Sequence, residues 1–286
     1  MRNNTSRQLS LIPRKLIMST LLTASLACSA IKQETATAQT KILIPLYSYP
    51  TWYNPPTYTW PKVAAAASQV PITAIINPNN GPDNGPPNRD YKRGIQDLKQ
   101  GGVTILGYVA TNYGKRNINE VKADIDIYAT HFHLDGIFLD EAASSPDKLN
   151  YYQEIYKHIK TQPKLQMVVL NQGTQTDPGY LTRPAGDNLV IFENYSKAWN
   201  QYQLQSYVKN YEPKHFSCLI HTVPDAATMK QHINQAVARN IQYIYVTDDS
   251  PDNPDKDPWN SLPSYWEEEV NHIRSLNQKV QRSSGS

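Results

Sequence analysis

Three acidic residues end or follow short apolar runs, where a folded chain could bring their carboxyl groups together. Asp140 ends the run Gly136–Asp140, Glu141 comes directly after it, and Glu193 ends the run Leu189–Glu193. Hydrolysis of a glycosidic bond needs two carboxyl groups on opposite sides of the anomeric carbon, because one protonates the leaving oxygen while the other attacks the carbon or activates water. These acids are therefore candidate catalytic residues; the alternative is that they only cap loops.

Eight such apolar runs alternate with amphipathic segments of helical length. The runs are Ile42–Tyr47, Ile72–Asn77, Val103–Tyr108, Gly136–Asp140, Met167–Asn171, Leu189–Glu193, Phe216–His221 and Ile241–Asp248. This alternation is typical of a parallel sheet, and eight units predict an α/β fold, a single (β/α)₈ TIM barrel. Active sites of such barrels lie at the C-terminal ends of the strands. The three acids would then share one rim, on alternate strands, within range of the roughly 5–5.5 Å separation of a retaining pair.

The segments between the runs predict the helices. We expect them at Trp60–Gln69, Arg89–Gln100, Asn117–His131, Pro146–Thr161, Trp199–Tyr211, Pro224–Asn240 and Leu262–Asn277, with a weaker one over Thr176–Arg183. The Gly/Pro/Asn-rich stretch from Pro78 to Asn88 predicts a long loop on the catalytic rim. Since successive strand residues point to opposite faces, only one of Asp140 and Glu141 can follow the strand pleat into the barrel mouth.

The N-terminus has the pattern of a secretory signal peptide. Basic residues precede the apolar segment Leu16–Ile31, and the small-residue site Ala36–Ala38 follows it. We therefore expect a signal peptide over residues 1–38 and secretion to an extracellular or periplasmic location. A lipid anchor at Cys28 is the less favoured alternative, because Ser25–Ala27 matches the usual preceding residues poorly.

The rest of the chain is expected to form one glycoside-hydrolase-like domain over residues 39–280, with a polar tail over 281–286. Residues 39–286 hold 23 Lys and Arg against 24 Asp and Glu, which removes the electrostatic case for nucleic acid. No apolar stretch long enough to cross a membrane follows the leader, so we expect no integral membrane segment after signal cleavage. The one later cysteine, Cys218, lies in an apolar run and is expected to be a buried hydrophobe.

No pattern in the sequence calls for a cofactor or a metal. No His/Cys cluster has zinc spacing, and Asp252, Asp255 and Asp257 do not have the spacing of an EF-hand calcium loop. We expect neither group, and we expect a monomer whose partner is a polysaccharide.

The aromatic composition favours a sugar ligand. The chain has 19 Tyr and 5 Trp against 4 Phe, and sugar rings stack on aromatic rings while their hydroxyls take hydrogen bonds. Aromatic and polar residues at the strand ends would supply both kinds of contact. The predicted substrate-binding residues are Tyr47, Tyr49, Trp52, Asn77, Tyr108, Asn171, Tyr195, His221, Asp248 and Asp249.

Three segments resemble the spherulin 4 (spherulation-specific) family. They are Pro45–Tyr47, Phe138–Ala142 and Phe192–Tyr195, and the similarity extends over residues 41–278. The resemblance implies a (β/α)₈ barrel and a glycoside hydrolase of family 135, cutting α-1,4-linked N-acetylgalactosamine in secreted exopolysaccharide. It also implies that Asp140 and Glu141 match the acid pair after strand four and that Glu193 matches the acid after strand six. By analogy with related barrels, Asp140 would be the nucleophile and Glu193 the acid/base, with Glu141 assisting.

We therefore expect a secreted, retaining endo-glycosidase acting on an amino-sugar-containing polysaccharide. One alternative is a non-catalytic carbohydrate-binding or cell-envelope protein on the same barrel, which would keep the aromatic rim without needing all three acids. The other is a hydrolase of a different α-linked glycan, built from the same acids with other loops.

Overall fold

The computed structural model describes residues 38–284. The expected signal peptide, apart from its last residue, and Cys28 lie outside these residues. No helix between residues 38 and 284 combines the length and apolar character that a membrane crossing requires.

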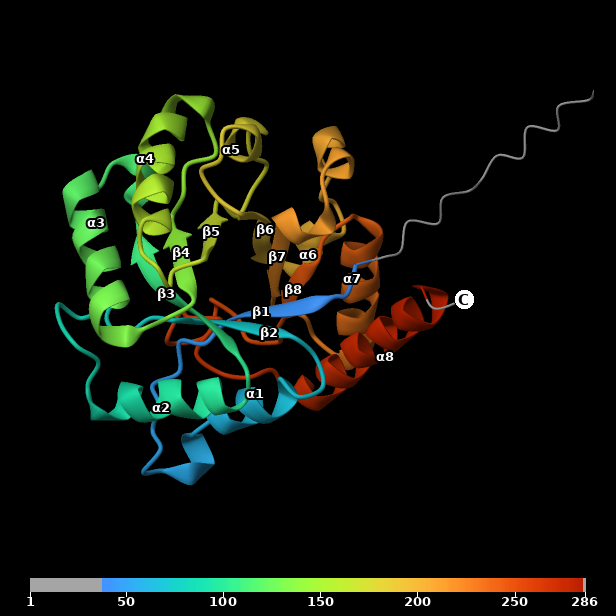
Figure 1. Cartoon of the computed structure of the whole chain (residues 1–286). Helices are drawn as coiled ribbons and strands as arrows, with labels where there is room; N and C mark the ends of the chain where they lie inside the picture. The colour runs from blue at the N-terminus through green and yellow to red at the C-terminus, as the bar shows by residue number, and fades with distance from the viewer. Residues whose placement is uncertain (1–37, 285–286) are drawn as a thin grey trace, which may run out of the picture. The chain divides into compact units, whose positions relative to one another are not determined.

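Eight parallel strands close a barrel in the order of the chain (Figure 1). They are β1 (Lys41–Pro45), β2 (Ile72–Ile76), β3 (Thr104–Ala110), β4 (Gly136–Asp140), β5 (Met167–Asn171), β6 (Asn188–Tyr195), β7 (Phe216–His221) and β8 (Tyr243–Val246). The prediction of a (β/α)₈ barrel is confirmed. Because parallel neighbours all end at the same edge, the residues that follow the strands form one rim.

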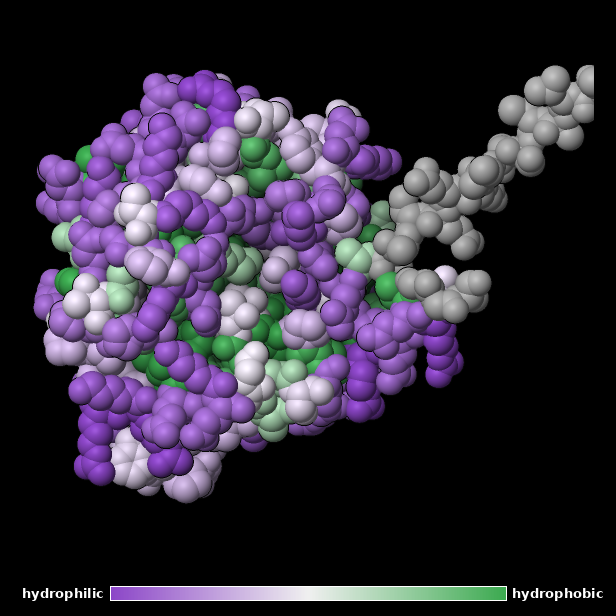
Figure 2. Space-filling view, in the orientation of Figure 1, coloured by the Kyte–Doolittle hydropathy of each residue, from purple (hydrophilic) through white to green (hydrophobic). Residues whose placement is uncertain are grey.

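Eight α-helices lie between and after the strands in the described part of the chain. They are α1 (Trp60–Ala66), α2 (Arg89–Gln100), α3 (Ile118–Ile127), α4 (Leu149–Lys160), α5 (Gly179–Thr182), α6 (Ser196–Trp199), α7 (Ala226–Ala238) and α8 (Trp266–Ser284). Short 3₁₀ helices cover Pro55–Thr57, Asn112–Gly114, Pro146–Lys148, Ser206–Asn210 and Pro213–His215, and a π-helix covers Tyr128–Phe132. The face in Figure 2 is mostly hydrophilic, with hydrophobic residues chiefly near its middle.

The sixth helix differs most from its prediction. A single helix over Trp199–Tyr211 is wrong, since α6 ends at Trp199 and only a 3₁₀ helix follows at Ser206–Asn210. Tertiary contacts override the helical pattern here. Tyr202 Oη donates to the Ile191 carbonyl of β6 at 2.9 Å, and Asn240 donates to the backbone carbonyls of Val208 and Tyr211. At the other end of the chain, residues 281–284 continue α8 instead of forming a separate tail.

The seam between β1 and β8 is opened at the rim by the loop that follows β8. The two strands pair only at Lys41 with Tyr243 and at Ile42 with Ile244. Nearer the rim, Tyr47 N donates to the Trp259 carbonyl at 3.2 Å. The loop of residues 247–265 therefore enters the barrel mouth and carries Trp259, which is 7 % exposed, into it.

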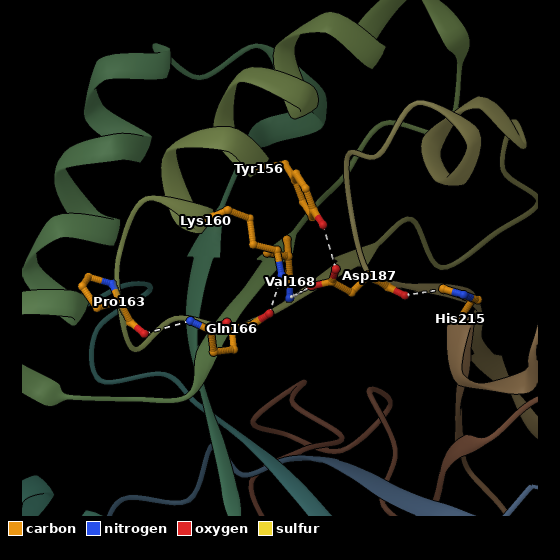
Figure 3. Close-up of polar contacts among 7 residues, drawn as sticks. All are labelled: Tyr156, Lys160, Pro163, Gln166, Val168, Asp187 and His215. Carbon is orange, nitrogen blue, oxygen red and sulfur yellow. Dashed lines mark hydrogen bonds and ion pairs between the residues drawn. The ribbon is translucent and has the colours of Figure 1, made fainter.

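The opposite end of the barrel is held by polar contacts to Asp187, which precedes β6 (Figure 3). Its carboxylate accepts from Tyr156 Oη at 2.9 Å, Lys160 Nζ at 2.7 Å and Val168 N at 2.8 Å, and its carbonyl accepts from His215 Nδ1 at 2.8 Å. One residue thus ties α4, β5 and the start of β7 together, at the end of the barrel away from the rim where the strands end.

We predict that Asp187→Ala lowers the free energy of unfolding by about 2–3 kcal/mol, because it leaves several buried or half-buried donors without an acceptor. Urea denaturation measures the loss. Asp126→Ala is the control, since Asp126 is an exposed acid that also pairs with α4, through His158. Equal, small losses in both variants would show that the Asp187 cluster is not a structural anchor.

Candidate active site

A polar pocket of about 370 Å³ opens at the C-terminal ends of β4 to β7. The acids Asp140, Glu141 and Glu193 all line it. Its other lining residues are Tyr113, Asn171, Gln172, Gly173, Asn194 and His221. The structure therefore brings the three predicted catalytic acids into one cleft.

The side-chain amide of Asn171 bridges two of these acids. Asn171 Nδ2 donates to Asp140 Oδ1 at 2.7 Å and to Glu193 Oε2 at 2.5 Å. Since both distances start from one nitrogen, the two accepting oxygens lie at most about 5.2 Å apart, which is closer than the roughly 6.5–9.5 Å of an inverting pair. Asn171, predicted as a substrate-binding residue, thus holds the two carboxyl groups in place.

Glu193 reaches the pocket because β6 contains a bulge. The register with β7 shifts between Val190 and Phe192, and the extra residue changes which side chains face the mouth. Gly173 fixes this geometry: its N donates to the Val190 carbonyl, and its carbonyl accepts from Glu193 N at 3.0 Å. A larger residue at position 173 would place its Cβ only 3.3 Å from the Cβ of Glu193, a tight contact. The backbone of Gly173 also has a φ of +62°, which favours glycine.

The pKa of Glu193 is raised from 4.5 to about 7. Burial is the main cause and repulsion from the Asp140 carboxylate is the second, while hydrogen bonds from Asn171 and from the Trp259 side chain partly oppose them. A carboxyl group that is still protonated near neutral pH can act as a general acid.

Asp140 and Glu141 take different positions, as the strand pleat predicts. Asp140 ends β4 and points at Asn171, whereas Glu141 turns with the loop at a φ of +49°. The Glu141 carbonyl accepts from Tyr113 N and Thr111 Oγ1, which holds this turn. Tyr108 Oη also bonds to the Asp140 carboxylate, and this negative neighbour is one reason why the pKa of Tyr108 is raised, after burial.

His221 forms the far wall of the pocket as a neutral imidazole. Burial lowers its pKa to about 4. Its ring contacts the Tyr195 ring, with centroids 4.4 Å apart, and the Trp259 ring at 5.8 Å. Its Nδ1 lies 3.0 Å from Thr222 Oγ1.

None of the other predicted substrate-binding residues lines the pocket, although some lie beside it. Tyr47 and Tyr108 pack edge to face beside the acids, with ring centroids 5.8 Å apart. Five others have side chains that form hydrogen bonds within the protein. Tyr49 and Trp52 donate to the Asp90 carboxylate, and Asn77 accepts from Gly81 N. Asp248 accepts from Ser264, and Asp249 accepts from Ser261. Their contact with a polymer stays a prediction.

Sequence reasoning missed Trp259, Gly173 and Thr222, which position the acids and the histidine. Trp259 offered the clearest signal, because a lone Trp in an Asp/Pro/Asn-rich loop is large and apolar where its neighbours are polar. Gly173 and Thr222 gave no such signal, since their roles depend on backbone conformations that only the assembled barrel imposes.

Comparison with known proteins identifies the family. The profile of spherulation-specific family 4 matches residues 41–273. The chain belongs to this family. A spherulation-specific family 4 relative, Spherulin-4 of Physarum polycephalum, is 37 % identical over 254 residues, covering 85 % of this chain and 73 % of the relative.

Solved structures agree with the family assignment. Sph3 of Aspergillus clavatus, determined in complex with GalNAc, is 28 % identical and superposes with a TM-score of 0.68, covering 84 % of this chain and 99 % of Sph3. The endo-β-1,4-glucanase Cel5B of Bacillus halodurans shares the barrel fold. Its TM-score is 0.52 at 10 % identity, and the match covers 85 % of this chain and 60 % of Cel5B.

We predict that Glu193→Gln stabilises the protein at pH 8 and has little effect at pH 4. Because the pKa of Glu193 is higher in the folded protein than in the unfolded chain, protonation of Glu193 stabilises the fold. This stabilisation is present below pH 4.5 and is lost as the pH rises through about 7. Replacing the ionised acid by a neutral amide should recover on the order of 2 kcal/mol at pH 8. Thermal unfolding of both proteins at the two pH values measures it; the same gain at pH 4 would rule out ionisation as the cause.

Proposed function

We propose that this protein is a secreted, retaining glycoside hydrolase that cleaves within a polysaccharide of α-1,4-linked N-acetylgalactosamine. The observation that carries the proposal is the Asn171 amide between Asp140 and Glu193, which holds an oxygen of each carboxyl group within about 5.2 Å of the other, closer than in an inverting pair. A carbohydrate-binding protein without activity would have no need to hold two acids so close, against their mutual repulsion.

In the first step, the Glu193 carboxyl gives its proton to the glycosidic oxygen while an Asp140 oxygen bonds to the anomeric carbon, and the carbon–oxygen bond to the leaving sugar breaks. In the second, Glu193 takes a proton from water, whose oxygen replaces Asp140 on that carbon. The raised pKa of Glu193 suits both roles near neutral pH. Donors from Asn171 and Tyr108 stabilise the negative charge that Asp140 carries before the first step and regains after the second.

The substrate class rests on the pocket and on the family. The relative Sph3 was solved with GalNAc, and the pocket here offers the amide of Asn194 and the imidazole of His221 to a hydroxyl-rich ring. Glu141, which also lines the pocket, would assist the acid pair by holding a sugar hydroxyl.

Exposed aromatic rings outside the pocket support action on a polymer. Tyr49 and Tyr53 are 42 % and 61 % exposed, and Asp90 fixes the rings of Tyr49 and Trp52 through hydrogen bonds at 2.9 and 2.7 Å. Flat rings held in this way would stack with sugar units beyond the cleavage point.

We expect Asp140→Asn and Glu193→Gln each to lower the rate of cleavage of an α-1,4-N-acetylgalactosamine polymer by at least about 10³-fold, because each removes one half of the acid pair. Release of reducing ends measures the rate, and proton NMR of the first product shows whether its anomeric configuration is retained. Asp126→Asn, at an exposed acid of α3 that does not line the pocket, is the control.

Full activity in either acid variant would remove that residue from the mechanism. Binding of the polymer by the unaltered protein without any cleavage would favour the carbohydrate-binding alternative, and cleavage of only another α-linked glycan would replace the proposed substrate.

A further inference from the structure

A chain of hydrogen bonds leads from the pocket wall to an acid in the β8–α8 loop. His221 Nδ1 lies 3.0 Å from Thr222 Oγ1, Thr222 Oγ1 donates to Ser250 Oγ at 3.1 Å, and Ser250 Oγ donates to Asp252 Oδ2 at 3.4 Å. Asp252 N also donates to Ser250 Oγ at 3.2 Å. Each hydroxyl in the chain therefore has an acceptor for its proton.

The carboxylate at the end of this chain sets its direction. The Asp252 carboxylate can only accept, so Ser250 donates to it and Thr222 donates to Ser250, which leaves Thr222 Oγ1 with only lone pairs to present to His221. His221 must then carry its proton on Nδ1, because a neutral imidazole has one protonated nitrogen. Nε2 is left with a bare lone pair in the pocket that His221 lines.

The backbone of Thr222 is strained to make this chain possible. Its φ is +58°, a conformation that a β-branched residue adopts only when its surroundings enforce it. Thr222 N donates to the Asp249 carbonyl at 2.8 Å and Val223 N to the Thr247 carbonyl at 3.0 Å, so the loop that follows β8 holds the turn. Strain of this kind gathers where a side chain must be aimed at a ligand.

Asp252 also holds the aromatic ring that packs against His221. Tyr195 Oη donates to Asp252 Oδ1 at 2.9 Å, and the Tyr195 ring lies against His221. Asp252 thus reaches His221 by two routes, one through the hydroxyl chain and one through an aromatic contact.

We propose that Asp252 is a positioning residue that, through Ser250 and Thr222, keeps His221 in the Nδ1–H tautomer, so that Nε2 accepts a hydrogen bond from a hydroxyl or amide N–H of the bound sugar. The contact with sugar rests on the proposed function, whereas the tautomer is a property of the protein alone. Asp252 itself does not touch the substrate.

The test is nitrogen NMR of protein labelled with ¹⁵N-histidine, at pH 7, with the His221 signals assigned from a His221→Gln variant. We expect Nδ1 to be protonated and Nε2 unprotonated in the unaltered protein. Thr222→Val removes the first hydroxyl. Asp252→Asn introduces an amide that can donate to Ser250 and so reverse the direction of the hydrogen bonds. Both variants should shift His221 towards the Nε2–H form. Asp255→Asn, a change of the same kind in the same loop, should leave the tautomer as it is.

With the polymer as substrate, Thr222→Val and Asp252→Asn should raise KM about tenfold and change kcat much less, because they weaken one ground-state hydrogen bond. A protonated Nε2 in the unaltered protein, or an unchanged tautomer in both variants, would overturn the proposal. If the tautomer shifts as expected but the unaltered protein cleaves no glycan, the proposed function fails while the role of Asp252 stands.

Discussion

One amide group shared between two acids is the interaction on which this site depends. Asn171 ends β5, and β5 lies between β4, which carries Asp140, and β6, which carries Glu193. An uncharged amide with two N–H donors can hold both carboxyl groups without neutralising either. A lysine in its place would lower the proton affinity of Glu193, and an aspartate would repel both neighbours.

The loop after β8 is the second element on which the proposed chemistry depends. It enters the seam where β1 and β8 stop pairing, and the Tyr47–Trp259 backbone contact holds it there. From this position the Trp259 side chain donates to Glu193, and Asp252 is linked to His221 through hydrogen bonds of Ser250 and Thr222. One loop thus positions two residues that line the pocket. An irregular join in the barrel thus provides contacts that a regular strand pair would not.

The sequence predicts the barrel and the meeting of the acids because strand order alone places them. Apolar runs such as Gly136–Asp140 and Phe216–His221 match β4 and β7 in full, and alternate strands bring Asp140 and Glu193 to one rim. The β6 bulge, the left-handed turn at Thr222 and the path of Trp259 could not be predicted, because each is fixed by hydrogen bonds between distant segments. The failed helix after Trp199 has the same cause, since hydrogen bonds to Ile191 of β6 and from Asn240 after α7 overrode its local pattern.

The most direct test of the account is the proton affinity of Glu193 with and without its charged neighbour. Carbon NMR of ¹³C-glutamate-labelled protein would follow its side-chain carboxyl group through a pH titration, with the signal assigned from Glu193→Gln. The account predicts a pKa of about 7 in the unaltered protein and a lower value in Asp140→Asn, where repulsion from Asp140 is absent. An ordinary glutamate pKa in the unaltered protein, or the same pKa in both proteins, would contradict it.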